Sequence, residues 1–270
     1  MIKHLLLLIS YGIFPLLMNA QHIPDLSLTY DYACEVKSLD EFRARFNGEE
    51  SKPGIYNDEN SRRTNLLNLF DVNMDKRGLT KEQFTNKLNN FIDSVLINDC
   101  QFKISDSNLW AECVCRMKYN KQDLMLTLYL QSECYDKNRY RWAIAGVKGL
   151  EKAGIIAKDE LYPISPVQHE VHFIGLQDML NENPKQAFGY RKKGTQIDQL
   201  SVFLAWVYAG IIEFEIVEKQ TFYYFDVPGY IFTINEIIRP GRNRGWLITS
   251  LEDASKEEKE IRIKRLIENE

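Results

Sequence analysis

The sequence is poor in the residues from which common catalytic sites are built. It has only four histidines, and no Gly-rich loop stands between a predicted strand and a predicted helix, so a nucleotide site is not indicated. It contains no Ser-His-Asp order, Cys-His nucleophile arrangement or zinc-type cysteine spacing. The net charge of −4 at pH 7 argues against a nucleic-acid partner, because nucleic-acid binders show a basic face.

Long apolar runs are also missing beyond the N-terminus. The chain begins MIKHLLLLISYGIFPLLMNAQ, where a short basic start, an apolar run to Leu17 and the small residue Ala20 follow the layout of a secretory signal peptide. A membrane span needs about 20 apolar residues, so this run is too short. We therefore expect residues 1–20 to be a signal peptide. The mature protein is expected to be exported and soluble, periplasmic or extracellular, with no transmembrane segment.

Five cysteines in an exported chain favour a disulfide. The stretch INDCQFKISDSNLWAECVC reads as two strands around a turn at Asp106-Ser107. Counting outward from that turn places Cys100 opposite Cys113, and directly opposed strand residues can come within disulfide reach. A Cys100–Cys113 disulfide is therefore predicted. The alternative is that the cysteines are reduced and buried as small apolar residues.

In residues 21–160, helices come first and strands follow. Capping boxes predict helices that begin after Ser38 and after Thr80, and a third helix includes SRRTNLLNLF. The helix after Thr80 has an apolar stripe suited to packing on a sheet. This order predicts an α+β fold with helices on one face of a curved antiparallel sheet. Strand-like runs are expected near 99–105, 108–118, 123–132 and 140–148.

Residues 161–270 follow the same plan after the proline-containing stretch KDELYPISP. The stretch GTQIDQLSVFLAWVYAG predicts a helix with Thr195 as N-cap, Asp198 as its capping-box partner and Gly210 as its stop. This helix is apolar on nearly every side, so we expect it to be largely buried. A charged helix is expected at the C-terminus. Strands are expected near 211–218, 221–226, 229–238 and 244–251.

The two halves align at an offset of 104 residues. YRWAIAGV and RGWLITSL then match Trp142 with Trp246, while Leu126 falls on Tyr230. The match weakens at the first strand, where Trp110 falls on Phe214 and a one-residue shift would repair the pattern. We therefore predict two tandem units of similar plan, residues 21–160 and 161–270.

The element order and the closing strands, RWAIAGV and GWLIT, resemble the NTF2-like superfamily of cone-shaped α+β domains. A cystatin-like helix and meander has a similar pattern. The NTF2-like resemblance implies a cavity between helices and sheet in each half. In that superfamily the cavity is an enzyme site in ketosteroid isomerases and polyketide cyclases, and a ligand or protein docking site in other members.

The stretch SPVQHEVHFIGLQDML contains two of the four histidines. His169 and His172 fall in the first turns of a predicted helix, three residues apart. The zincin motif needs histidines four apart, and Phe173 stands where the second would be. A His-x-x-His pair can still hold a metal with further ligands, but no third ligand is identifiable. We predict no metal and no cofactor, and keep His169 and His172 as candidate ligand-binding residues.

Four other residues are candidates for a ligand site. Asp198 is a carboxylate at the start of the most apolar helix, although it also suits the helix cap. Arg239 and Arg242 lie in RPGRNRGW, which can be an anion-binding patch or a solvated turn. Tyr230 lies in the aromatic stretch TFYYFDVPGYIF, which can be a docking surface or core.

These observations favour an exported, soluble binding or assembly module without catalytic activity, whose partner is an unknown small molecule or protein. One alternative is a small-molecule isomerase or hydrolase with its site in the cone of the second domain, containing Asp198, His169 or His172. Another is a structural partner in a periplasmic or cell-surface complex. A titratable group buried in a closed cavity would favour the enzyme, and filled cones with an exposed apolar patch would favour the structural partner.

Overall fold

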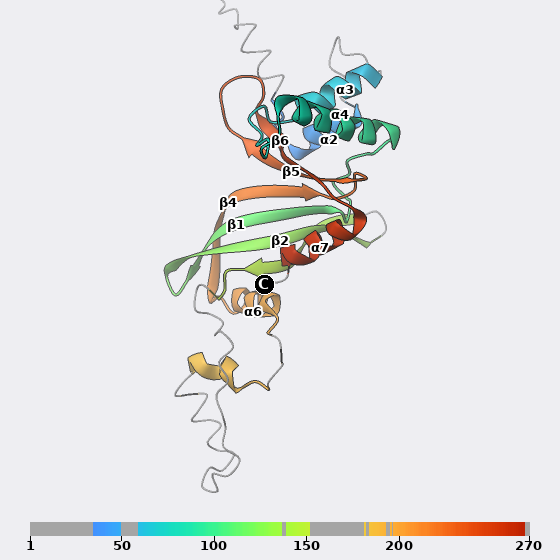
Figure 1. The fold of residues 1–270 in the computed structure, drawn as a ribbon. Helices are drawn as coiled ribbons and strands as arrows, with labels where there is room; N and C mark the ends of the chain where they lie inside the picture. The colour runs from blue at the N-terminus through green and yellow to red at the C-terminus, as the bar shows by residue number, and fades with distance from the viewer. Residues whose placement is uncertain are drawn as a thin grey trace, which may run out of the picture.

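A computed structural model describes residues 35–49, 59–136, 139–151, 181, 184–192, 195 and 197–267. Six strands form one sheet in the order β3-β2-β1-β4-β5-β6, and each neighbouring pair is antiparallel (Figure 1). The predicted α+β class and antiparallel sheet are therefore confirmed. Strands from both halves of the chain share this one sheet. The boundary predicted near residue 161 lies outside the described residues.

The elements begin and end close to the predicted positions. Ser38 and Thr80 are N-caps, and Thr80 forms a complete capping box with Gln83. The strands are β1 Leu109–Tyr119, β2 Gln122–Asp136, β3 Arg139–Lys148, β4 Ile212–Tyr224, β5 Tyr230–Ile237 and β6 Gly245–Asp253. The helices are α2 Leu39–Asn47, α3 Glu59–Asn68, α4 Lys81–Ile97, the 3-10 helix η1 Pro184–Tyr190, α6 Gln199–Tyr208 and α7 Lys256–Ile267.

Two strand predictions were wrong. Residues 99–105 form a connection instead of a strand, and the runs 211–218 and 221–226 form the single strand β4. The 99–105 connection is held by side chains, because Asn47 Oδ1 accepts a 2.8 Å hydrogen bond from Phe102 N and Asn47 Nδ2 donates a 3.1 Å bond to Phe102 O. These bonds take the main-chain groups that a strand would pair with another strand.

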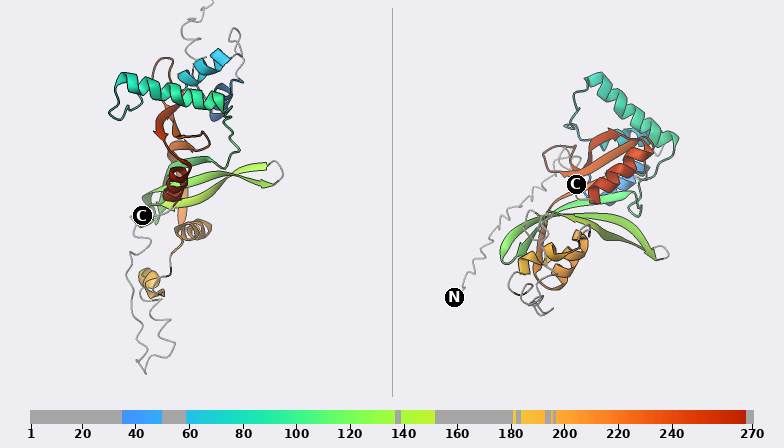
Figure 2. Two further views of the ribbon diagram at one scale, coloured as in Figure 1. Left: turned by 45° about the vertical axis from the view of Figure 1, so that its right-hand side comes forward. Right: turned by 60° about the horizontal axis from the view of Figure 1, so that its bottom comes forward.

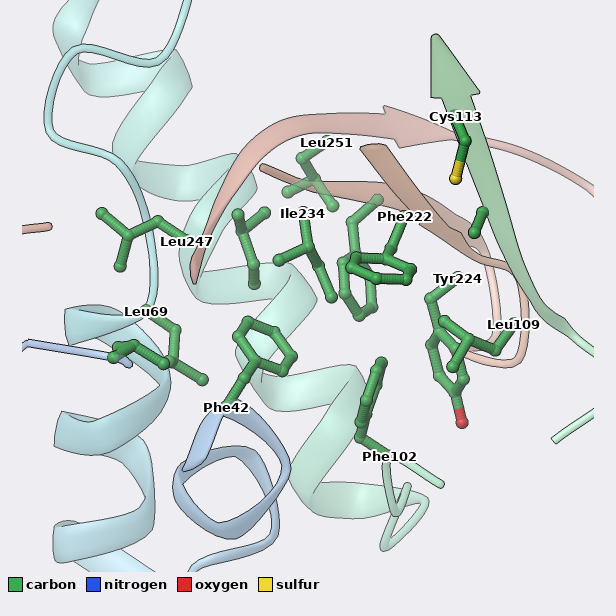
Figure 3. Close-up of a cluster of buried hydrophobic side chains, with 14 of the residues drawn as sticks. Phe42, Leu69, Phe102, Leu109, Cys113, Phe222, Tyr224, Ile234, Leu247 and Leu251 are labelled. Carbon is green, nitrogen blue, oxygen red and sulfur yellow. The ribbon is translucent and has the colours of Figure 1, made fainter. Parts of the chain in front are cut away.

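The main core lies between one face of the curved sheet and helices α2, α3 and α4, which gather near β5 and β6 (Figures 1 and 2). Close-packed aromatic rings fill its centre (Figure 3). Phe42 and Phe102 meet edge to face, with ring centroids 5.1 Å apart. The core is therefore solid at this end and holds no open cone. The fully buried phenylalanines are Phe42, Phe46, Phe91, Phe102 and Phe232.

The opposite face of the sheet is covered by α7 (Figure 2). Leu266 of α7 packs with Trp110 and Tyr129 in a second, smaller apolar cluster. Lys259 anchors the start of α7, because its Nζ donates hydrogen bonds of 2.7 Å to Phe225 O and 2.5 Å to Val227 O. The sheet is thus covered on both faces, which explains why its central strands read as apolar on both sides.

The two outer hairpins have the same register when 104 is added to each residue number. In β2–β3, Leu130 pairs with Ile144. In β5–β6, Ile234 pairs with Ile248. Each hairpin also has a register shift immediately before this pair, so a β-bulge stands at the corresponding place in both. A shared bulge is a more specific similarity than alternation, because alternation is common to half-buried strands.

The inner strands do not follow this offset. Trp110 of β1 pairs with Gln131, and the residue that corresponds to Gln131 is Asn235. Asn235 pairs with Thr221 and not with Phe214, so the predicted one-residue shift does not repair the alignment. The difference arises at the connections. β1 and β2 are joined by a two-residue turn, whereas residues 225–229 join β4 and β5.

Candidate functional site

An open groove of about 570 Å³ lies between the end of α2, the 101–105 connection and the start of β3. It is the best-formed cavity in the described part of the chain, and it brings together residues that are far apart in the sequence. Its lining residues are Arg43, Asn47, Glu49, Gln101, Phe102, Lys103, Ile104, Ser105, Ser132, Tyr140, Arg141 and Trp142.

The base of the groove is rigid. Phe102 is fully buried in the aromatic core, and Asn47 holds both of its main-chain polar groups. Ser132 of β2 is also buried, and its hydroxyl donates a 2.7 Å hydrogen bond to Ile104 O. The connection is therefore fixed to α2 on one side and to the sheet on the other, so a ligand would meet a surface that is already ordered.

One wall of the groove consists of aromatic side chains from β3. Tyr140 is 48% exposed and Trp142 is 37% exposed. The ring of Trp142 also lies 5.9 Å from the ring of Phe222, which holds its inner edge against the core. The closing strand was predicted to bury its tryptophan, and for Trp142 this is wrong. The side chain lies at the mouth of the groove because β3 is the last strand of the sheet and has no neighbour beyond it.

Cationic side chains stand on both sides of the groove. Arg43 donates a 2.9 Å hydrogen bond to Asp40 and is paired with Glu49. The hydrogen bond from Arg43 lowers the pKa of Glu49, so this carboxylate is ionised at neutral pH. Arg141 is paired with Glu133 at 2.7 Å. With Lys103, the groove lining holds three cations and one carboxylate, a balance that favours an anionic ligand.

The structure places the predicted site residues apart from this groove. Asp198 is exposed and is itself the N-cap of α6, since it accepts a 3.2 Å hydrogen bond from Leu200 N. The prediction that Thr195 caps this helix was therefore wrong. Tyr230 packs edge to face on Phe91, with ring centroids 5.4 Å apart. It is an edge of the core.

The predicted arginine patch is a structural link. Arg239 forms a 2.7 Å ion pair with Asp71 and a 2.6 Å hydrogen bond with Asn243 O. These bonds join the β5–β6 connection to the segment after α3. Arg242 is exposed in the same connection. His169 and His172 lie outside the described residues, as does the leader predicted for residues 1–20.

Cys100 and Cys113 form no disulfide with each other in this structure. Cys100 follows the end of α4, and Cys113 lies in β1 between its partners Leu128 and Gln220. The predicted pairing depended on a strand at 99–105, which is not formed. Burial raises the pKa of the Cys100 and Cys113 thiols. They behave as small core residues, which was the stated alternative.

Helix α6 was expected to be largely buried, and this was wrong. Phe203 is its only fully buried side chain, whereas Tyr208 is 95% exposed. The neighbouring strand adds the exposed residue Phe214 to an apolar surface. This surface lacks the convergent polar groups that select a ligand. The groove combines shape, charge and aromatic faces, so it is the stronger candidate.

Comparison with protein-family models, curated proteins and solved structures found no match for this chain. The described residues contain no group of three or more histidine, cysteine, aspartate or glutamate side chains placed to hold a metal ion. No helix among them is long and apolar enough to cross a membrane. The proposals below therefore rest on the geometry of the chain itself.

Proposed function

We propose that this protein is an exported, non-catalytic binding or assembly module that holds its partner in the groove between α2 and β3. The observation that carries the proposal is the exposed pair Tyr140 and Trp142, which faces three cationic side chains across a rigid base. Exposed aromatic rings beside charged groups are typical of recognition surfaces. The export step is supported by the composition of residues 1–20.

We further propose that the chain consists of two related units. The support is the common offset of 104 residues between the β2–β3 and β5–β6 hairpins, together with the β-bulge that each carries at the corresponding place. In this proposal the units meet along β1 and β4, which pair over the full length of β1.

The binding proposal can be tested by selection from a random peptide library and by a glycan array, using residues 21–270. The test variant is Tyr140→Ala/Trp142→Ala, and the control is Tyr208→Ala, which removes an exposed aromatic residue far from the groove. A ligand that loses about tenfold or more in affinity with the test variant alone supports the proposal. If every ligand found binds the test variant as well as the wild type, the groove is not the binding site.

The export proposal has a separate test. Expression with the native leader in a secreting host should give a mature protein that begins at Gln21, as read by N-terminal sequencing. Full retention of residues 1–20 would contradict it.

A further inference from the structure

The sheet has two edges, and the corresponding strands β3 and β6 form them. Because the hairpins share one register, each main-chain group on the outer edge of β6 has a counterpart on β3, 104 residues earlier. Trp246 corresponds to Trp142 and Ile248 to Ile144. The molecule therefore provides an internal comparison between two equivalent edges.

The outer edge of β6 is occupied by extended segments of the same chain. Val36 and Phe70 form parallel bridges to Gly245 and Ile248. Val36 O accepts a 2.8 Å hydrogen bond from Trp246 N. Further along the edge, Ile248 N donates a 2.7 Å bond to Leu69 O, and Ile248 O accepts a 2.9 Å bond from Asp71 N. These segments cover the edge as an added parallel strand would.

The corresponding groups of β3 are Trp142 N, Ile144 N and Ile144 O. Within the described ranges, no segment beyond the β2 partner forms a main-chain hydrogen bond with them. Residues 141 and 142 are exposed and 143 and 144 are half-buried, whereas 245–248 are buried or half-buried. The groove described above opens beside this part of β3. An unpaired strand edge of this kind is a template for an added strand.

The two edges differ at one position. Gly245 has a φ of +85°, and a Cβ there would lie 2.1 Å from Val36 O. Its counterpart on β3 is Arg141, so an added strand cannot approach this point as closely. We therefore expect contacts with β3 to centre on Trp142 and Ile144. Arg141 instead offers a guanidinium group that can receive a carboxylate from the partner in place of Glu133.

We propose that the partner is a protein with an extended acidic segment, and that this segment adds to the sheet as a strand parallel to β3. The proposal rests on the proposed function and names its ligand class. Main-chain bonds to Trp142 and Ile144 supply a general affinity. Carboxylates that face Arg141 and Lys103, and an apolar side chain against Trp142, supply selectivity, because three of the four charged groups that line the groove are cationic.

The β6 edge supplies the design of a probe. The peptide Ac-Glu-Val-Lys-Ser-Phe-Asp-NH2 joins the sequence of residues 35–38 to that of residues 70–71, which keeps the three-residue spacing between the two bridges on β6. In the β6 pattern the amide of the final Asp points to the strand, as Asp71 N does to Ile248 O. The amide of Phe points away, since Phe70 N donates to Leu67 O.

Binding of this peptide to residues 21–270 is measured by titration in ¹H–¹⁵N correlation spectra. We expect the amide signals of Trp142 and Ile144 to shift and the dissociation constant to lie below ~1 mM. N-methylation of the Asp amide should weaken binding about tenfold, because one main-chain hydrogen bond is lost and its acceptor stays desolvated. N-methylation of the Phe amide is the matched control and should change the affinity less than about twofold. Trp142→Ala should weaken binding, and Tyr208→Ala should not.

The outcomes separate this proposal from the binding function. If a groove-dependent ligand is found but N-methylation at Asp has no more effect than at Phe, the groove binds ligands by side chains alone and strand addition is wrong. Failure of the peptide to shift the Trp142 and Ile144 signals at ~1 mM also overturns strand addition. If these signals broaden as the concentration of protein alone rises, a second copy occupies the edge, and the partner-peptide proposal is wrong.

Discussion

Single polar side chains fix the segments that the main chain leaves without partners. Asn47 satisfies both main-chain groups of Phe102. Arg62 acts in a similar way, because its Nε donates a 3.1 Å bond to Phe46 O and its Nη2 donates a 2.6 Å bond to Cys100 O. The groove therefore depends on a few residues whose importance is not visible in an apolar pattern.

Asn47→Ala should destabilise the protein by about 2–4 kcal/mol, because the amide and carbonyl of the buried Phe102 lose both bonds. The control is Asn98→Ala, which removes one exposed bond to Ser94 O and should cost less than about 1 kcal/mol. Urea unfolding measures both. Equal effects of the two substitutions would show that Asn47 does not hold the connection.

The cysteines should differ in reactivity. Burial raises the pKa of Cys115 to about 11 and raises the pKa of Cys113 as well, whereas Cys134 is exposed. In native protein with Cys34→Ser, a thiol reagent should modify Cys134 at once and the two buried β1 thiols only after unfolding. Mass spectrometry of proteolytic fragments reads this. A Cys100–Cys113 disulfide in non-reduced fragments would contradict the structure.

Asp226 should oppose stability at neutral pH. Loss of solvent around its carboxyl group, and then the nearby charge of Asp106, raise its pKa. For an acid with a raised folded pKa, the stabilising contribution is complete below the unfolded pKa and is lost as pH rises through the folded pKa. Asp226→Asn should therefore be more stable than the wild type at pH 7, by less than about 1 kcal/mol, and the difference should vanish near pH 4.

Asp123→Asn provides the opposite sign as a control. The hydrogen bond from Lys118 lowers the pKa of Asp123, so its contribution is present above the unfolded pKa and is lost as pH falls. Denaturant unfolding from pH 4 to 8 measures both variants. A stability gain for Asp226→Asn that grows towards pH 4 would contradict the assignment.

Among the elements, the edge strands differ most in environment. β6 is closed by Val36 and Phe70, and the closure depends on a glycine at the point of closest approach. β3 has a corresponding register but a different neighbour on its outer side. Two hairpins with the same pairing can therefore have different roles, one in holding the fold together and one in recognition.

Gly245→Ala should force Val36 away from β6, because the new Cβ would overlap the carbonyl of Val36 and φ is positive. We expect a loss of about 3 kcal/mol or more. Gly241→Ala is the matched control, since its φ is +96° and nothing lies within 4 Å of the new Cβ. It should cost only about 1–2 kcal/mol. Thermal unfolding compares them, and equal losses would mean that the close approach to Val36 is unimportant.

At the scale of the whole molecule, the shared sheet should make both halves unfold together. β1 and β4 pair along the full length of β1, and one core contains residues from both halves. Leu126→Ala in the first half and Phe232→Ala in the second should each lower the same single transition, by about 2–5 kcal/mol. Calorimetry with far- and near-ultraviolet circular dichroism tests this. Two separate transitions would contradict it.

The accuracy of the sequence predictions follows the range of the interactions involved. The helix starts at Ser38 and Thr80 were predicted correctly because a cap involves residues three positions apart. The alternation of Leu124, Leu126 and Leu128 was also predicted correctly, since all three are buried. The 99–105 strand was wrong, because Asn47, more than fifty residues away, supplies the hydrogen bonds there.

The candidate site was not predicted. Trp142 and Trp246 lie in similar sequence contexts, and only their neighbours in space separate an exposed side chain from a half-buried one. The groove joins α2, the 101–105 connection and β3, which no local pattern links. Arg239 was selected correctly as unusual, but its partner Asp71 shows that it links two connections.

The sequence by itself determined the α+β class, the capped helices and the repeated hairpin register, because these depend on spacing along the chain. The tertiary structure decided which edge of the sheet is closed, where the aromatic wall is exposed and which thiols are buried. The physical reason is that an edge strand is satisfied only by a neighbour from elsewhere in the chain or from another molecule. In this protein Val36 and Phe70 satisfy the edge at β6, and the corresponding groups of β3 have no such neighbour among the described residues.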